Sequence, residues 1–123
     1  MSGNNILLDS NIIIYLLSGD NKLKSYFENK SFYISSINEL ELLGYKGISN
    51  EEAEALNYFL EECSVIELNP GIKKITIDIR RKFSIKLPDA IIAATAIFLN
   101  IPLISADRHF EKIPELTFIL YQP

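Results

Sequence analysis

The sequence predicts an α/β fold in which a central, mostly parallel sheet of about five short strands is flanked by helices on both faces. Short apolar runs alternate with segments of helical period along the whole chain, the order that builds a parallel sheet with helical crossovers. The 123 residues are 48% hydrophobic, which suits one domain with a single core. No internal repeat or linker interrupts this pattern, so we expect a single domain over residues 1–123.

Five short runs of apolar and β-branched residues are the predicted strands. The first run is wholly apolar, as expected of a strand that is buried on both faces. The strands are predicted at residues 6–8, 32–34, 65–66, 102–105 and 117–120.

The helices are predicted from their start signals and their apolar period. Ser49 and Glu52 match a capping box, and Pro70 suits the first position of a helix. The helix that Pro70 begins keeps its apolar period through Phe83, and Pro88 starts the next one. The helices are predicted at residues 12–17, 22–28, 39–43, 49–62, 70–83, 88–100 and 107–112.

The composition excludes several classes of protein. A charged content of 23% is typical of a folded chain, and no apolar stretch reaches the roughly 18 residues that a membrane span needs. The first five residues lack a basic segment leading into an apolar run, so no signal peptide is predicted. Cys63 is the only cysteine and is expected in a helix face; a single cysteine fits a reducing cytoplasm. The net charge of −4 argues against a general nucleic-acid coat protein.

Acidic residues follow the predicted strands. Asp9 follows the first strand, Glu39 and Glu41 follow the second, and Asp107 follows the fourth. Asp89 lies in the first turn of the most apolar helix. In an open α/β sheet, sites form at the carboxyl ends of the strands, so these acids are candidates for one site.

Each acid also has a purely structural interpretation. Asp9 and Asp107 can cap helices, and Asp89 can be a first-turn acid that the helix dipole stabilises. Residues 36–39 match a capping box that ends in Glu39. Several carboxylates at one sheet edge would repel one another and would need a counter-ion. Carboxylate oxygens are hard ligands that suit Mg²⁺ or Mn²⁺, so the set as a whole suits metal-assisted phosphodiester hydrolysis.

Three motifs resemble those of PIN-domain nucleases, in the right order and over nearly the whole chain. They are Ile-Leu-Leu-Asp-Ser-Asn at residues 6–11, Lys-Leu-Pro-Asp-Ala-Ile-Ile-Ala-Ala-Thr-Ala at residues 86–96, and Leu-Ile-Ser-Ala-Asp-Arg-His-Phe at residues 103–110. Among PIN proteins, the length most resembles that of VapC-type toxins. The resemblance implies a PIN-like fold, an RNA substrate and a Mg²⁺ (or Mn²⁺) cofactor.

The resemblance also selects one of the two acids that follow the second strand. The family pattern of Ser, a short gap and Thr-x-x-Glu-Leu corresponds here to Ser35, Asn38 and Glu41, and therefore points to Glu41. Residues two apart differ by roughly 200° around a helix, so Glu39 and Glu41 cannot face one metal. Asn38 stands where the family often has Thr, and it is expected to cap the helix.

The implied site consists of four acids and two polar residues beside them. The expected metal ligands and catalytic residues are Asp9, Glu41, Asp89 and Asp107. Asn11 and Ser105 are expected to position waters or a carboxylate around one or two ions. His109, the only histidine, is expected at the surface or in a cap.

Half of the 12 basic residues fall in one short stretch, which can be a solvated helix face or a track for the RNA backbone. They are Lys73, Lys74, Arg80, Arg81, Lys82 and Lys86.

The resemblance implies a protein partner as well. A VapC-type toxin would pair with an antitoxin, whose segment would lie across the site or in an apolar groove between the early helices; a homodimer is a further expectation. Residues that could contact the antitoxin are Ile13, Ile14, Tyr15, Leu17 and Tyr45. The alternative hypothesis is a catalytically inactive PIN-like module that binds a protein or RNA partner.

Overall fold

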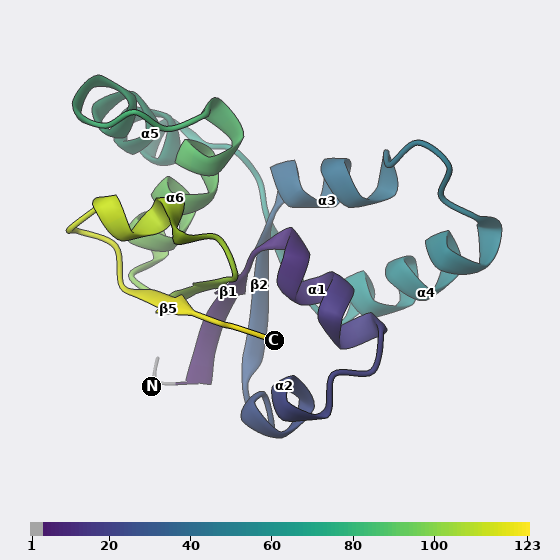
Figure 1. Cartoon of the computed structure of the whole chain (residues 1–123). Coiled ribbons are helices and arrows are strands. Elements are labelled where there is room, and N and C mark those ends of the chain that lie inside the picture. Colours follow the sequence, from purple (N-terminus) through teal and green to yellow (C-terminus); the bar gives the residue numbers. More distant parts are fainter. Residues whose placement is uncertain (1–3) are drawn as a thin grey trace.

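A computed structural model describes residues 4–123 as an α/β fold built on one five-stranded sheet (Figure 1). Residues 1–3, which belong to the segment predicted to lack a signal peptide, lie outside the described residues. The strand order is β3-β2-β1-β4-β5, and every neighbouring pair is parallel. The strands are β1 (Asn5–Leu8), β2 (Ser31–Ser35), β3 (Ser64–Ile66), β4 (Leu103–Ser105) and β5 (Phe118–Leu120). The predicted parallel sheet is confirmed.

Six α-helices and one 3₁₀ helix connect the strands. They are α1 (Ser10–Leu17), α2 (Asn21–Tyr26), α3 (Ser36–Leu43), α4 (Asn50–Glu61), α5 (Pro70–Lys82), α6 (Leu87–Leu99) and the 3₁₀ helix η2 (Arg108–Lys112). Within residues 4–123, none of the helices is long and apolar enough to cross a membrane.

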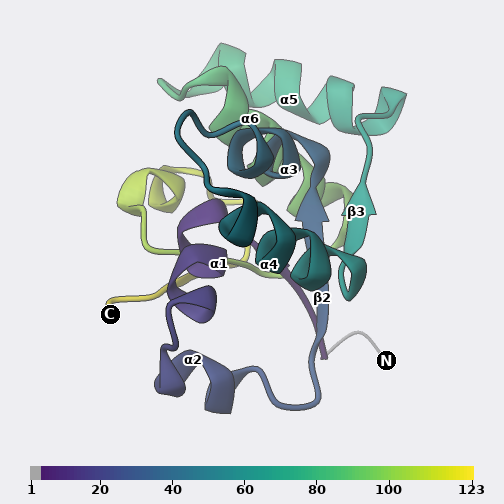
Figure 2. The same cartoon turned by 90° about the vertical axis from the view of Figure 1, so that its right-hand side faces the viewer.

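Alternating side chains of the central strand divide the core into two layers. Leu7 of β1 joins the cluster formed with α5 and α6, where its companions include Ile79 and Ala93. Ile6 and Leu8 point the other way, into the cluster formed with α1, α2 and α4. The two helical layers lie on opposite sides of the sheet in Figure 1, and Figure 2 looks onto α1 and α4 in front of the strands. Both faces of the sheet are therefore covered, as predicted.

Most of the predicted helix starts are confirmed. Ser49 and Glu52 form the full capping box of α4, with hydrogen bonds of 2.9 and 3.0 Å, and Pro70 is the first residue of α5. Two details differ. The cap of α3 is Ser35 rather than a residue of the 36–39 segment. Helix α5 ends at Lys82, because Phe83 adopts an extended conformation while its ring still packs on the core.

Candidate metal site

Four acids meet at the carboxyl edge of the sheet. Asp9 is the single residue between β1 and α1, and its side chain caps α1. Asp107 follows β4 and caps η2, whereas Glu41 projects from α3 and Asp89 from the first turn of α6. Each of these acids interacts electrostatically with at least one other member of the set. The structure therefore brings all four predicted residues together, and we call this set the acidic pocket.

Asp9 is the most buried member of the acidic pocket, with 8% of its surface exposed. Its Oδ1 accepts hydrogen bonds from the backbone N–H of Ser10 at 2.8 Å and from Asn38 Nδ2 at 3.2 Å, and its Oδ2 accepts from Ser105 Oγ at 2.6 Å. Burial raises the pKa of Asp9; the hydrogen bonds from Ser105, Ser10 and Asn38 lower it in part, and the charge of Asp107 raises it again.

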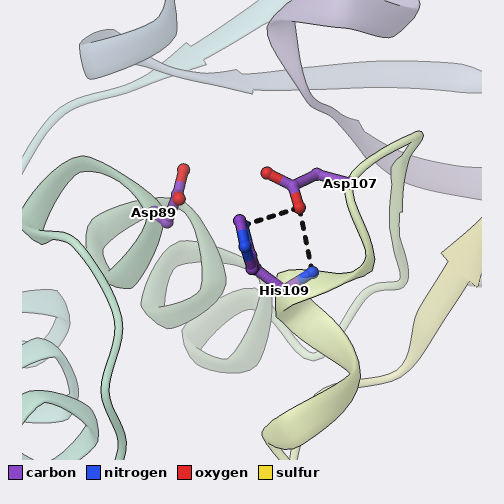
Figure 3. A group of neighbouring side chains, drawn as sticks. All are labelled: Asp89, Asp107 and His109. Carbon is purple, nitrogen blue, oxygen red and sulfur yellow. Dashed lines mark hydrogen bonds and ion pairs between the residues drawn. The ribbon is translucent and has the colours of Figure 1, made fainter.

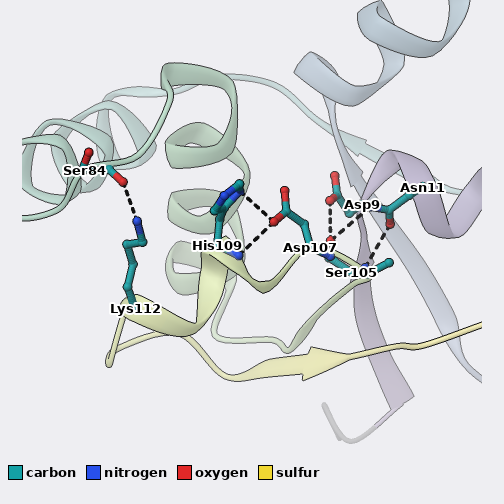
Figure 4. A network of polar contacts seen from close by, with 8 residues as sticks. Asp9, Asn11, Ser84, Ser105, Asp107, His109 and Lys112 are labelled. Atoms are coloured by element: carbon teal, nitrogen blue, oxygen red, sulfur yellow. Dashed lines mark hydrogen bonds and ion pairs between the residues drawn. The ribbon is translucent and has the colours of Figure 1, made fainter.

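Ser105 and Asn11 connect Asp9 with Asp107 (Figure 4). The Oγ of Ser105 accepts from the backbone N–H of Asp107 at 3.0 Å and from Asn11 Nδ2 at 3.5 Å. The Oδ1 of Asn11 accepts from the backbone N–H of Ala106 at 3.2 Å. Both residues thus lie beside the acids, as expected, and their functional role stays a prediction.

Asp89, Asp107 and His109 are close enough together to bind the same metal ion. One potential ligand atom of each lies within 4.8 Å of the others (Figure 3). His109 Nδ1 is 2.8 Å from Asp107 Oδ1, and the backbone N–H of His109 donates to the same oxygen at 2.9 Å. His109 is exposed, as expected, but its position beside two acids of the pocket was not predicted. His109 follows the capping residue Asp107 by two positions, and this spacing is the sequence signal that could have placed His109 beside the pocket.

The remaining two acids experience the charge of the rest of the pocket. Partial burial raises the pKa of Glu41, and the charges of Asp9 and Asp89 raise it further. Burial also raises the pKa of Asp89, with contributions from Asp9 and Asp107 that the charges of His109 and Lys86 partly offset. Glu41, an exposed residue of α3, therefore lies near enough to Asp9 and Asp89 to feel their charge, and its choice over Glu39 as a site residue stays a prediction.

The donor set fits a divalent cation. Asp89, Asp107 and His109 offer oxygen and nitrogen ligand atoms within 4.8 Å of one another. Asp9 and Glu41 add negative charge beside them, and mutual repulsion of the acids favours a bound positive charge. Within residues 4–123, no lysine or arginine forms an ion pair with any acid of the pocket. The charges of His109 and Lys86 therefore offset the repulsion at Asp89 only in part, and its pKa stays raised.

A cleft opens from Asp89 and Asp107 toward basic side chains. Arg80 and Lys86 line it, and so do His109 and Lys112. Of the six predicted basic residues, only Arg80 and Lys86 border the cleft. The other four are exposed elsewhere on α5. Hydrogen bonds also connect residues that line the cleft. Lys112 Nζ donates to the carbonyl of Ser84 at 2.7 Å, and Arg80 donates to the carbonyl of Ile85 at 3.2 Å.

An apolar groove lies between α1, α3 and α4. Its lining residues are Ser10, Ile13, Ile14, Leu17, Ser18, Glu41, Leu42, Tyr45, Ile48, Glu52, Ala55 and Leu56. Ile14, Leu17 and Tyr45 are 52%, 45% and 70% exposed, which is unusual for such large apolar side chains. Tyr15 does not line the groove; its ring lies 6.2 Å from that of Tyr121.

The prediction that Asn38 caps α3 is wrong. Ser35 is the cap, and Asn38 lies inside the helix with none of its surface exposed. Its Nδ2 donates to Asp9 Oδ1 at 3.2 Å and to Ser10 Oγ at 2.7 Å. Asn38 precedes Glu41 by three residues, so both lie on one helix face, which is the signal that could have placed it at the pocket.

Comparison with known proteins identifies the family. A model of the PIN domain matches residues 6–116, which is most of the chain. The chain belongs to the PIN domain family. The predicted PIN-like fold and family are thus confirmed for this PIN domain, although no match was found among curated proteins.

Solved structures agree with this assignment. This PIN domain is similar to a chain of a toxin–antitoxin complex from Klebsiella pneumoniae, with 29% identity, a TM-score of 0.81 and coverage of 96% of this chain and 99% of that chain. It is also similar to a chain of VapBC-1 from nontypeable Haemophilus influenzae, with 26% identity, a TM-score of 0.79 and coverage of 94% and 97%. A chain of the DNA-bound VapBC from Salmonella typhimurium shares the fold, with 20% identity, a TM-score of 0.83 and coverage of 94% and 96%.

Proposed function

We propose that this PIN domain is a divalent-metal-dependent ribonuclease, the toxin of a type II toxin–antitoxin pair. The observation that carries the proposal is the acidic pocket, in which acids from four segments meet without a lysine or arginine ion pair among residues 4–123. Membership of the PIN family supports the nuclease. The structurally similar proteins named as toxin–antitoxin complexes support the biological role.

In this proposal, Asp9, Glu41, Asp89 and Asp107 hold one or two Mg²⁺ or Mn²⁺ ions. When bound, such a cation lowers the pKa of water and offsets the negative charge that develops on phosphoryl oxygens. The chain itself supplies the orientation: Ser105 holds Asp9 and Asp107 in register.

Basic residues of the cleft would receive the substrate. Arg80, Lys86 and Lys112 line the cleft that also holds Asp89 and Asp107, and their positive charge would attract an RNA backbone that the acids repel. Water then attacks phosphorus, the bond from phosphorus to the leaving oxygen breaks, and the products are shorter RNA chains.

The test combines metal binding with RNA digestion. Wild type is expected to bind Mn²⁺ in calorimetry and to cut RNA only with Mg²⁺ or Mn²⁺ present, whereas Asp9→Asn should abolish cleavage. Helix α3 offers a matched pair, since Glu41→Gln should reduce the rate at least about tenfold and Glu39→Gln should leave it unchanged. Normal cleavage by Asp9→Asn would refute the mechanism, and Mn²⁺ binding without any RNA cleavage would favour the inactive binding module instead.

We propose that the antitoxin occupies the apolar groove, because its exposed side chains form one continuous surface beside Ser10 and Glu41. The product of the neighbouring reading frame should co-purify with wild type and be lost with Ile14→Lys. Retention of that product by Ile14→Lys would place the contact elsewhere. Assembly of a homodimer and residence in the cytoplasm also stay predictions; sedimentation and cell fractionation test them.

A further inference from the structure

The side chain of Asn38 has an unusual hydrogen-bonding pattern for a buried amide. Both of its N–H groups are used, one toward Asp9 Oδ1 at 3.2 Å and one toward Ser10 Oγ at 2.7 Å. Its Oδ1 is buried and has no hydrogen-bond partner among residues 4–123. Asn38 therefore acts only as a donor, and both of its acceptors belong to the acidic pocket or to the residue next to it.

The chemistry of Asp9 determines which end of the amide faces it. An ionised carboxylate only accepts hydrogen bonds, so turning the amide over would set two acceptor oxygens against each other. Asn38 therefore presents its nitrogen to Asp9. Together with Ser10 and Ser105, it completes three donors that restrain both oxygens of this carboxylate.

The second N–H of Asn38 orients the hydroxyl of Ser10. The oxygen of Ser10 accepts from Asn38, which leaves the hydroxyl proton free to point elsewhere. Ser10 lies at the rim of the apolar groove, which Glu41 also lines. On the opposite side, Asn11 donates to Ser105, whose hydroxyl donates to Asp9. Each of the two amides thus donates to the hydroxyl oxygen of a serine that itself hydrogen-bonds to Asp9, Ser10 through its backbone N–H and Ser105 through its hydroxyl.

The unpartnered oxygen shows that this arrangement is not the most stable one available. A buried acceptor without a partner is less stable than a satisfied one. An apolar side chain of similar size would avoid that cost but would remove both donors from the pocket. The unpartnered Oδ1 of Asn38 is therefore consistent with a role in which its Nδ2 donates to Asp9.

We propose that Asn38 is a positioning residue that aims the Asp9 carboxylate at the divalent cation. This inference rests on the proposed metal-dependent function. Groups that orient a metal ligand typically contribute 10–100-fold to metal affinity, and we expect an effect of about that size.

The experiment measures the affinity for Mn²⁺ alone by calorimetry and the melting temperature of each metal-free variant. Asn38→Leu keeps a branched but larger side chain and Asn38→Ala shortens it. Both remove the donors, so both should weaken Mn²⁺ binding about 10–100-fold although their melting temperatures differ. Asn38→Thr restores one donor and should give an intermediate affinity. Thr95→Val is the control, because Thr95 is 1% exposed and bonds only within α6, to the carbonyl of Ile91.

Each outcome has one meaning. If both donor-free variants bind Mn²⁺ within about twofold of wild type while Asp9→Asn loses binding, the positioning role of Asn38 is refuted and the proposed function stands. If Asp9→Asn also binds normally, the proposed function fails. Should Asn38→Ala not fold, Asn38→Leu alone decides. If Thr95→Val weakens Mn²⁺ binding to the same extent as the Asn38 variants, the effect of Asn38 is one of general packing and the inference is overturned.

Discussion

Replacing Asp89 by Asn should stabilise the metal-free protein, because it removes one charge from the acidic pocket. Potential ligand atoms of Asp89 and Asp107 lie within 4.8 Å of each other. At that separation the repulsion is about 1 kcal/mol in bulk water and about 3.5 kcal/mol at an effective dielectric constant of about 20. The variant also loses a favourable interaction with the α6 dipole of about 0.3–1 kcal/mol. A net gain of about 1 kcal/mol should raise the melting temperature by about 4 °C.

The assay is thermal unfolding followed by circular dichroism in EDTA at low ionic strength. Glu51→Gln is the matched control, since Glu51 is an exposed acid in the first turn of α4 and loses only the dipole interaction. At about 1 M salt the Debye length falls to about 3 Å, so the gain of Asp89→Asn should shrink. Saturating Mn²⁺ should reverse the order of the two melting temperatures. An Asp89→Asn variant that is no more stable than wild type in EDTA would refute the repulsion argument.

Lowering the pH from about 7 to about 5 should raise the melting temperature of the metal-free protein. Three carboxyls of the acidic pocket have raised pKa values, so the folded state binds more protons than the unfolded state in this range and stability falls as pH rises; a melting temperature that drops on acidification would contradict this. Asp20→Asn should lower the pKa of Tyr121 from about 12 toward 10.0, because Asp20 accepts the Tyr121 hydroxyl at 2.6 Å, and tyrosinate absorbance measures the shift. Lys86→Gln should weaken RNA binding and reduce its logarithmic salt slope by about one, while Lys24→Gln, on α2, should leave the slope unchanged.

Much of the site could be predicted because the ends of the strands can be located from the sequence. Asp9 and Asp107 follow apolar runs directly, and a parallel sheet brings such ends to one edge. Both acids also cap helices, so the structural and the functional interpretations hold together rather than excluding each other. The choice of Glu41 over Glu39 needed the family pattern, because helical geometry only excludes that both face one ion.

What could not be predicted depends on the direction of side chains in three dimensions. Asn38 was expected to cap a helix, since Asn does so often, but the chain turns into α3 three residues earlier, at Ser35. Four of the six basic residues of the 73–86 segment do not reach the cleft, because burial of Ile72 and Ile79 sets how α5 is rotated. Lys112, distant in sequence, lines the cleft instead.

Glu41 and Ser10 belong to two surfaces at once, since they border the apolar groove and also interact with the acidic pocket. In the proposed function, a divalent cation in the acidic pocket would add two positive charges along this common wall, and a polypeptide in the groove would change the solvation of the Glu41 carboxylate. The two binding equilibria are then thermodynamically linked, and the linkage is reciprocal: any factor by which metal alters the affinity of the groove occupant is the factor by which that occupant alters the affinity for metal.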